Sequence, residues 1–171
     1  MQPTIEPTAS VQIDEYPRSW CSSKESIFCV GFESGRICHF DSFGDLLEES
    51  SIEGSVIGLV ALDGSIIAAS STNGLFSLGE IVWNLDMESG CEYISPSEVG
   101  VFAIDGSDNI LHVSSKGEVL CSKKIGPVDV IQSSDNGLHI GLGLGDGRLI
   151  ILDNELNTLF ESHPAADDVE T

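Results

Sequence analysis

Basic residues are scarce in this sequence. Lysine and arginine together number 7 in 171 residues, against 28 aspartates and glutamates, so the formal net charge is −21 at pH 7. Neutralising the phosphates of a nucleic acid requires a patch of lysine and arginine, and so few basic residues do not make one. Anionic membrane surfaces are disfavoured for the same reason. The composition therefore predicts neither a nucleic acid nor a membrane as a partner.

The acidity itself has two interpretations. It would either complement a basic protein partner or serve solubility in an organism whose proteome is generally acidic. The acidic residues are spread along the chain rather than gathered in blocks, and this spacing favours the second interpretation.

Long apolar runs are also missing. No stretch approaches the roughly 20 apolar residues that span a bilayer as a helix, and residues 1–8 have neither the basic head nor the apolar core of a signal peptide. We therefore expect a cytoplasmic protein. Hydrophobic residues make up 41% of the chain, which argues against disorder, and one domain is the default at this length.

The cysteines are odd in number, and no two have the CxxC spacing of a common zinc site. Neither a disulfide framework nor such a zinc site is expected. Most of them adjoin apolar residues in expected strands, where a free thiol behaves as a small hydrophobic side chain. The five are Cys21, Cys29, Cys38, Cys91 and Cys121.

What the sequence does contain is a repeated hairpin. In Gly137–Asp153 two apolar runs flank Asp146-Gly147, a strong signal for a tight β-turn. Looser copies occur upstream, each with short alternating strands, tight turns and no helical spacing. The turn residues Gly35, Gly74, Asn109 and Gly147 recur at steps of roughly 40 residues, and four strands per such unit indicate a β-propeller.

The predicted fold is therefore all-β, with about four propeller blades of four antiparallel strands each. We expect a flexible arm at 1–16, with an edge strand at 11–16, and a disordered acidic tail at 162–171. The blades are expected at about 17–52, 53–89, 90–125 and 126–161.

Residues 35–47 and 147–159 resemble the hairpin between the third and fourth strands of WD40-like and quinoprotein-like (PQQ-type) propeller repeats. The resemblance implies a propeller, and propellers of these families usually have six to eight blades. Four blades would then form either a small closed ring or half of a larger one. An open half exposes the apolar faces of its terminal blades, which would drive association with a second copy or another chain.

Few residues indicate chemistry. The run Gly141–Gly147 lacks the glycine spacing of a phosphate-binding loop, and no helix is expected after it. Four histidines are too scattered for a local metal motif, although His39 and His112 fall in the third strand of their units, one position apart in register. The turn aspartates Asp41, Asp63, Asp105, Asp146 and Asp153 are expected to bond their own backbone.

Large aromatic residues are the best candidates for partner contacts. Phe43, in a turn, is the first candidate, followed by Trp20 and Tyr93, whereas Trp83 is expected to pack between blades. No catalytic, cofactor or metal-binding residue is assigned.

The sequence thus favours a non-catalytic interaction module or scaffold. Its expected partner is a protein, with a basic protein as one candidate, and a homodimer is one way to complete the ring. The alternative is a propeller-fold hydrolase, or a metal- or small-ligand-binding protein, with a site on the propeller axis. A purely architectural piece of a larger assembly is a third interpretation.

Overall fold

The computed structural model describes residues 10, 12–23, 27–62, 64–79 and 81–163. All regular elements in these residues are β-strands, and each strand pairs antiparallel with the next along the chain, in four sheets of four. The fold is therefore all-β with four propeller-like blades. This fold agrees with the prediction made from the short strands and tight turns of the sequence.

The blades follow one another in chain order. Blade 1 contains β1 (Pro17–Ser22), β2 (Phe28–Phe32), β3 (Arg36–Phe40) and β4 (Leu46–Ser51). Blade 2 contains β5 (Val56–Leu62), β6 (Ser65–Ser70), β7 (Gly74–Gly79) and β8 (Trp83–Asp86). Blade 3 contains β9 (Cys91–Pro96), β10 (Gly100–Asp105), β11 (Asn109–Ser114) and β12 (Val119–Lys124). Blade 4 contains β13 (Val128–Ser133), β14 (His139–Leu144), β15 (Leu149–Asp153) and β16 (Thr158–Ser162).

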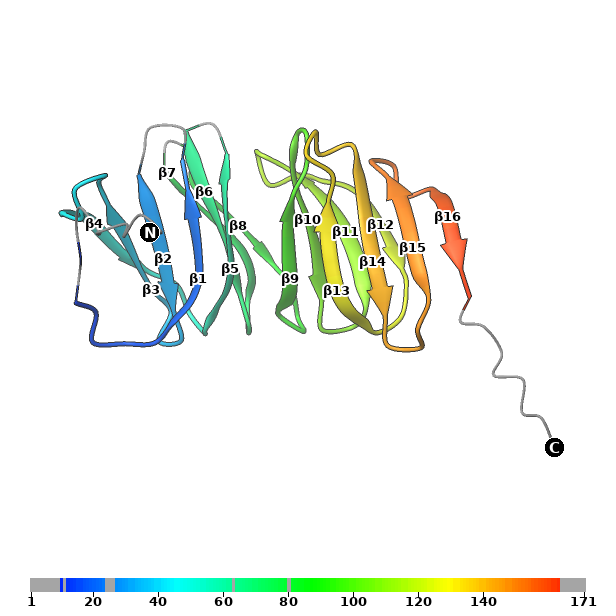
Figure 1. The fold of residues 1–171 in the computed structure, drawn as a ribbon, viewed down its shortest axis with the longest axis horizontal. Helices are drawn as coiled ribbons and strands as arrows, with labels where there is room; N and C mark the ends of the chain where they lie inside the picture. The colour runs from blue at the N-terminus through cyan, green and yellow to red at the C-terminus, as the bar shows by residue number, and fades with distance from the viewer. Residues whose placement is uncertain (1–9, 11, 24–26, 63, 80, 164–171) are drawn as a thin grey trace, which may run out of the picture.

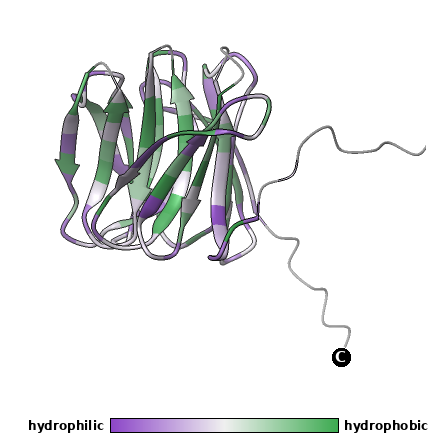
Figure 2. Ribbon diagram, turned by 90° about the vertical axis from the view of Figure 1, so that its left-hand side faces the viewer, coloured by the Kyte–Doolittle hydropathy of each residue, from purple (hydrophilic) through white to green (hydrophobic). Residues whose placement is uncertain are grey.

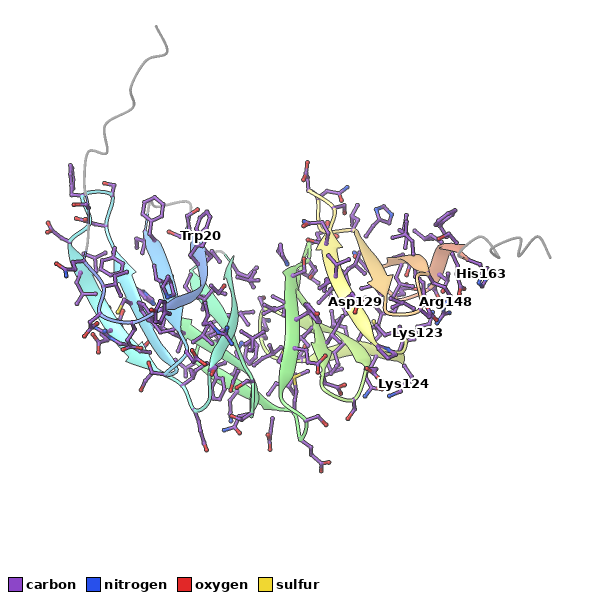
Figure 3. All side chains as sticks on the ribbon, turned by 60° about the horizontal axis from the view of Figure 1, so that its bottom comes forward. Trp20, Lys123, Lys124, Asp129, Arg148 and His163 are labelled. Carbon is purple, nitrogen blue, oxygen red and sulfur yellow. The ribbon has the colours of Figure 1, made fainter. Side chains whose placement is uncertain are left out.

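The four blades stand side by side and form an open arc. Their first strands are neighbours, since β1 contacts β5, β5 contacts β9 and β9 contacts β13. Blades 1 and 4 lie at opposite ends of the molecule (Figure 1), and the curvature of the row is visible in Figure 3. The two ends of the described chain do not meet to close a ring.

The hydrophobic core lies in the joints between blades. Cys29 and Ile37 of blade 1 pack with Val56 of blade 2, and Ile67 of blade 2 is in one cluster with Val101 of blade 3. Phe102 of blade 3 packs among residues of blade 4 in the largest cluster. Most of the core therefore forms where one blade covers the next, while Phe32, Cys38 and Phe40 form a small separate cluster on the outer face of blade 1.

Aspartate side chains close several turns, as expected from the sequence. In Asp41, Asp105 and Asp153 one carboxylate oxygen accepts backbone N–H bonds at 2.8–2.9 Å from the residues two and four positions later. Asp146 accepts one such bond, from Arg148 at 3.1 Å. Asp63 lies outside the described residues. These carboxylates therefore have a local structural role at the turns.

One register prediction is wrong. Gly35 and Gly147 have positive φ values of 87° and 86°, as a tight turn requires, but in blade 3 the positive φ of 60° falls on Asp108 and not on Asn109. Counted from these turn residues, His39 and His112 occupy the same position, not neighbouring ones. An aspartate reaches this conformation because its short polar side chain can bond locally.

The segment before blade 1 also differs from expectation. Residues 12–16 of the expected edge strand are irregular, and Val11 lies outside the described residues. Ile13 packs on the outer face of blade 1, and Arg36 binds Asp14 and Glu15 at 3.2 and 3.5 Å. Side-chain contacts hold this segment where strand pairing was expected. At the other end, Ser162 belongs to β16, and 164–171 lie outside the described residues.

Candidate interaction faces and an interblade cleft

The face of blade 1 that points away from blade 2 is only partly covered; we call it the N-terminal open face. Trp20, Phe28 and Val30 lie on it, on the opposite side of the sheet from Cys29, which packs toward blade 2. Trp20 is 71% exposed and Phe28 is 43% exposed. Figure 2 views the molecule from this end, and Figure 3 shows Trp20 on β1. This face exposes apolar side chains that interior blades bury.

The C-terminal open face is the side of blade 4 that points away from blade 3. Ile140 and Leu142 of β14 are buried against blade 3, so Gly141 and Gly143, which alternate with them, lie on the other side. Val130 pairs with Gly143 and is 59% exposed. Leu149, Ile151 and Phe160 extend this surface across β15 and β16.

The first residue of β1 is exposed, whereas the equivalent residues of the other three blades are buried. Val56, Cys91 and Val128 begin the first strands of blades 2, 3 and 4, each paired with the last residue of the second strand, and all three are buried. Pro17 holds the same position in blade 1, paired with Phe32, and it is exposed. The difference is that no described blade precedes blade 1.

The other aromatic candidates lie elsewhere. Phe43 is 79% exposed at the turn between β3 and β4. Tyr93 is half-buried in the joint of blades 3 and 4, and its hydroxyl donates to the Asp129 carbonyl at 3.2 Å. Trp83 packs in the joint of blades 2 and 3 and donates to the Ser115 carbonyl at 2.9 Å, which confirms its expected role. The three contact candidates, Phe43, Trp20 and Tyr93, therefore lie in different parts of the structure.

Two arginines at the open faces, Arg36 and Arg148, are paired with carboxylates of the chain. Arg36 contacts Glu49 at 2.8 Å, and Arg148 contacts Asp146 and Glu161 at 2.7 and 2.8 Å. The hydrogen bond from Arg148 lowers the pKa of the Asp146 carboxyl. Exposed pairs of this kind contribute little stability, and they leave the surrounding surface strongly acidic.

A cleft of about 1090 Å³ lies between blades 1 and 2. Blade 1 contributes Cys29, His39, Glu48 and Ser50, and blade 2 contributes apolar residues such as Ile66. Its polar wall follows one row of the sheet, since register pairs Cys21 with Cys29, Cys29 with His39, and His39 with Glu48. The sequence interpretation placed Cys29 in the core and left this row unnoticed, because only pairing across four strands assembles it.

This row changes the acidity of its members. Hydrogen bonds from Cys21 and His39 lower the pKa of Cys29 to about 5, although burial opposes the shift. The same bond with Cys29 raises the pKa of His39, and the bond with Cys29 together with burial raises that of Cys21. The arrangement favours a Cys29 thiolate beside a protonated His39 and a neutral Cys21 thiol.

His112 occupies the same register in blade 3 but has a complete set of partners. It is 2% exposed, its Nδ1 lies 2.7 Å from the Asn154 carbonyl, and its Nε2 lies 2.9 Å from Ser97 Oγ. Its ring stacks on Phe102 with 4.6 Å between ring centroids. This histidine therefore holds the joint between blades 3 and 4.

Within the described residues no group of three His, Cys, Asp or Glu side chains is placed to hold a metal ion. A second, smaller cleft of about 370 Å³ is bordered by Glu53, Asn73, Phe76 and two further residues of blade 2. None of the described segments is a helix of the length and apolarity needed to cross a membrane.

Comparison with known proteins identifies the fold. The chain is similar to the WD40 β-propeller domain of Doa1, with 17% identity and a TM-score of 0.72 over 92% of this chain and 58% of that one. The Neurospora crassa Pan2 WD40 domain matches with 13% identity and a TM-score of 0.70, over 87% of this chain and 50% of the other. The expected WD40-like propeller fold is thereby confirmed.

A computationally designed protein, Ika4, is similar at 15% identity and a TM-score of 0.75, over 88% of this chain and 99% of the designed one. The chain thus spans about half the length of the two WD40 domains and nearly all of this designed protein. No family model matches the sequence, and no curated protein matches it.

Proposed function

We propose that this chain is a non-catalytic protein-interaction module whose open arc is completed to a ring by a second copy of itself. The observation that carries the proposal is the pair of open faces at the two ends of the arc. One exposes Trp20 and Phe28, and the other exposes Val130 and Phe160. Adjacent exposed apolar side chains of this kind mark association surfaces.

The joints inside the chain support a second copy as the occupant. We call the face of a blade that points toward the next blade along the chain its following side, and the opposite face its preceding side. In each joint the following side of one blade packs against the preceding side of the next. The C-terminal open face is a following side and the N-terminal open face is a preceding side, so two copies offer each other the combination that the chain already uses. A two-fold axis then makes both contacts at once, and the assembly closes without further growth.

A glycine in the second strand supports the same contact. Gly31, next to last in β2, leaves no room for a side chain because its neighbour across the joint is Val56. Gly143 holds the equivalent place in β14, on the C-terminal open face. Blade 4 thus has at this position the same small residue as blade 1, although here the Val130 side chain of the same blade lies over the glycine.

The extent of the structural matches also supports an incomplete ring. The chain aligns with about half of the Doa1 and Pan2 WD40 domains, which are propellers. Propellers of this fold commonly bind other proteins through their rims, and fold alone does not fix a partner. In the proposed ring the exposed Phe43 turn would take part in such contacts, and the acidic surface would speed encounters with basic proteins in the cytoplasm.

The mass of the native particle tests the proposal. The chain has a mass of 18.2 kDa, and we expect light scattering at 150 mM salt to give twice that value. Salt should favour the dimer, because each copy carries a net charge of −21 and screening weakens their repulsion. A stable monomer would overturn the proposal, and a trimer or filament would overturn the closed two-copy ring.

A matched pair of substitutions locates the contact. Val130→Glu places a charge on the C-terminal open face and should give monomers. Val119→Glu makes the same change on β12 of an interior blade, at a residue that is 45% exposed, and should leave the dimer intact. If both variants or neither dissociate, the contact is not the open face of blade 4.

A further inference from the structure

The row Cys21, Cys29, His39 and Glu48 crosses all four strands of blade 1 on the side that faces blade 2. It places two thiols directly opposite each other and an imidazole next to them. Three of its members, Cys29, His39 and Glu48, border the cleft of about 1090 Å³ between blades 1 and 2. This joint therefore differs from the other joints of the arc in both packing and chemistry.

The equivalent row of blade 3 has a large aromatic side chain at the position of Cys29. There Phe102 stands in the place of Cys29 and stacks on His112 at 4.6 Å. Both ring nitrogens of His112 have partners, whereas Nε2 of His39 is buried without a hydrogen bond in the described structure. A histidine that has one ring nitrogen without a partner and lies beside a thiolate at a cleft is better placed to react than to stabilise the joint.

The two sulfur-bearing residues are close enough to join. The hairpin between β1 and β2 closes with a hydrogen bond from Ser23 N–H to the Ile27 carbonyl at 2.9 Å. Two positions further along the ladder, Cys21 and Cys29 then form a hydrogen-bonded pair, whose Cα atoms lie about 5.5 Å apart in antiparallel sheets. This separation lies within the range that a disulfide spans.

We propose that Cys21 and Cys29 are a redox-active pair, oxidised by hydrogen peroxide to a disulfide with His39 as the proton donor. The cleft admits an oxidant close to water in size, although Cys29 itself is fully buried. The site goes beyond the interaction role proposed above. It lies within one chain, so its test does not depend on whether the ring forms.

The reaction balances with the groups present. The Cys29 thiolate attacks one peroxide oxygen, the O–O bond breaks, and the departing hydroxide takes a proton from His39 and leaves as water. The Cys21 sulfur then attacks the Cys29 sulfenic acid, forming the S–S bond. The expelled hydroxide takes the Cys21 proton as a second water. Two electrons pass from the thiols to the peroxide.

The unmodified chain provides its own reference thiol. Trypsin cuts after Arg18, Lys24 and Arg36, which places Cys21 in peptide 19–24 and Cys29 in peptide 25–36, while Cys121 falls in peptide 117–123. After brief treatment with peroxide at pH 6 and a denaturing quench with an alkylating agent, mass spectrometry should find 19–24 linked to 25–36 through a disulfide. Peptide 117–123 should remain alkylated.

The expected rate difference is about tenfold. At pH 6 the ionised fraction favours Cys29 over an ordinary thiol by roughly 300-fold. The lower nucleophilicity of a low-pKa thiolate offsets roughly 40-fold of this advantage. Oxidation of Cys29 no faster than that of Cys121, or a disulfide from Cys29 to any residue other than Cys21, would overturn the proposal.

Two variants separate the roles within the row. Cys21→Ser should leave Cys29 as a sulfenic acid that dimedone traps in the quench, with no disulfide. His39→Gln should slow the loss of the Cys29 thiol at pH 6 severalfold, whereas His112→Gln should not. If His39→Gln reacts as fast as the unmodified chain while remaining folded, His39 is not the proton donor and the proposal fails in that part.

Discussion

Two joints of the arc contain a histidine at the same register, but the two histidines differ in their packing and hydrogen bonding. Between blades 3 and 4, His112 stacks on Phe102 and bonds Ser97 and Asn154. Between blades 1 and 2, His39 lies beside Cys29 and a cleft, and its Nε2 has no hydrogen-bond partner in the described structure. The same backbone position thus serves cohesion in one joint and leaves reactive groups in the other.

One exchange of side chains contributes to this difference. Phe102 fills the space that Cys29 leaves open, because an aromatic ring buries far more surface than a thiol. Without a ring to stack on, His39 interacts with the Cys29 thiolate, and Glu48 on the next strand favours its charged form. Joints of one architecture can therefore differ in packing and chemistry through the side chains at equivalent positions, of which Cys29 and Phe102 are one pair.

The largest expected effect comes from making the closed joint resemble the open one. Phe102→Cys removes a fully buried ring, and the cavity should lower the free energy of unfolding by about 3 kcal/mol. Urea unfolding at a fixed protein concentration measures it. Cys29→Ala is the control in the other joint and should cost about 1 kcal/mol or less. Equal losses would mean that the two joints contribute equally to stability.

The histidines themselves should separate by a smaller margin. His112→Ala removes the partner of the Ser97 hydroxyl and one of the two partners of the Asn154 carbonyl, which also accepts from the Cys121 thiol, so the free energy of unfolding should fall by about 2 kcal/mol. His39→Ala should change it by less than about 1 kcal/mol, because His39 borders a cleft. Thermal unfolding of both variants in one buffer compares them, and a greater loss for His39→Ala would contradict the assignment of His112 as the structural residue.

Much of this fold was predictable from local sequence. Alternating apolar residues and turn pairs such as Asp146-Gly147 indicated the strands, and their repeat indicated the blades. The exact register of blade 3 was not predictable, because Asp108 and Asn109 are both able to adopt positive φ and the sequence does not show which one does. That one-residue uncertainty hid the equivalence of His39 and His112.

The cleft and its row were beyond sequence analysis for a different reason. Cys21, Cys29 and His39 each resemble ordinary strand residues, and only pairing across strands brings them together. Whether a joint is filled also depends on side chains from the next blade. Interaction candidates fared similarly, since Tyr93 proved to lie in a joint while Trp20 lies on an open face. Such contacts are tertiary, and periodicity carries no information about them.

The smallest expected effect is a pH dependence confined to the open joint. The pKa of Cys29 is lowered in the folded chain to about 5, so the folded state holds the thiolate where the unfolded chain is still protonated. This stabilisation is present at higher pH and is lost as the pH falls through 5. His39 has a raised pKa and acts in the opposite sense, losing its contribution as the pH rises above about 6.5.

Well below pH 6.5 the contribution of His39 is nearly constant, so of these two groups mainly the thiol changes its contribution between pH 5 and 6.5. We expect the stability difference between the unmodified chain and Cys29→Ser to grow as the pH rises through this window, measured by urea unfolding at several pH values. Cys121→Ser is the matched control, because burial raises the Cys121 pKa and its thiol stays protonated throughout. A flat difference for Cys29→Ser would show that no thiolate forms there, and the two joints would then differ in packing alone.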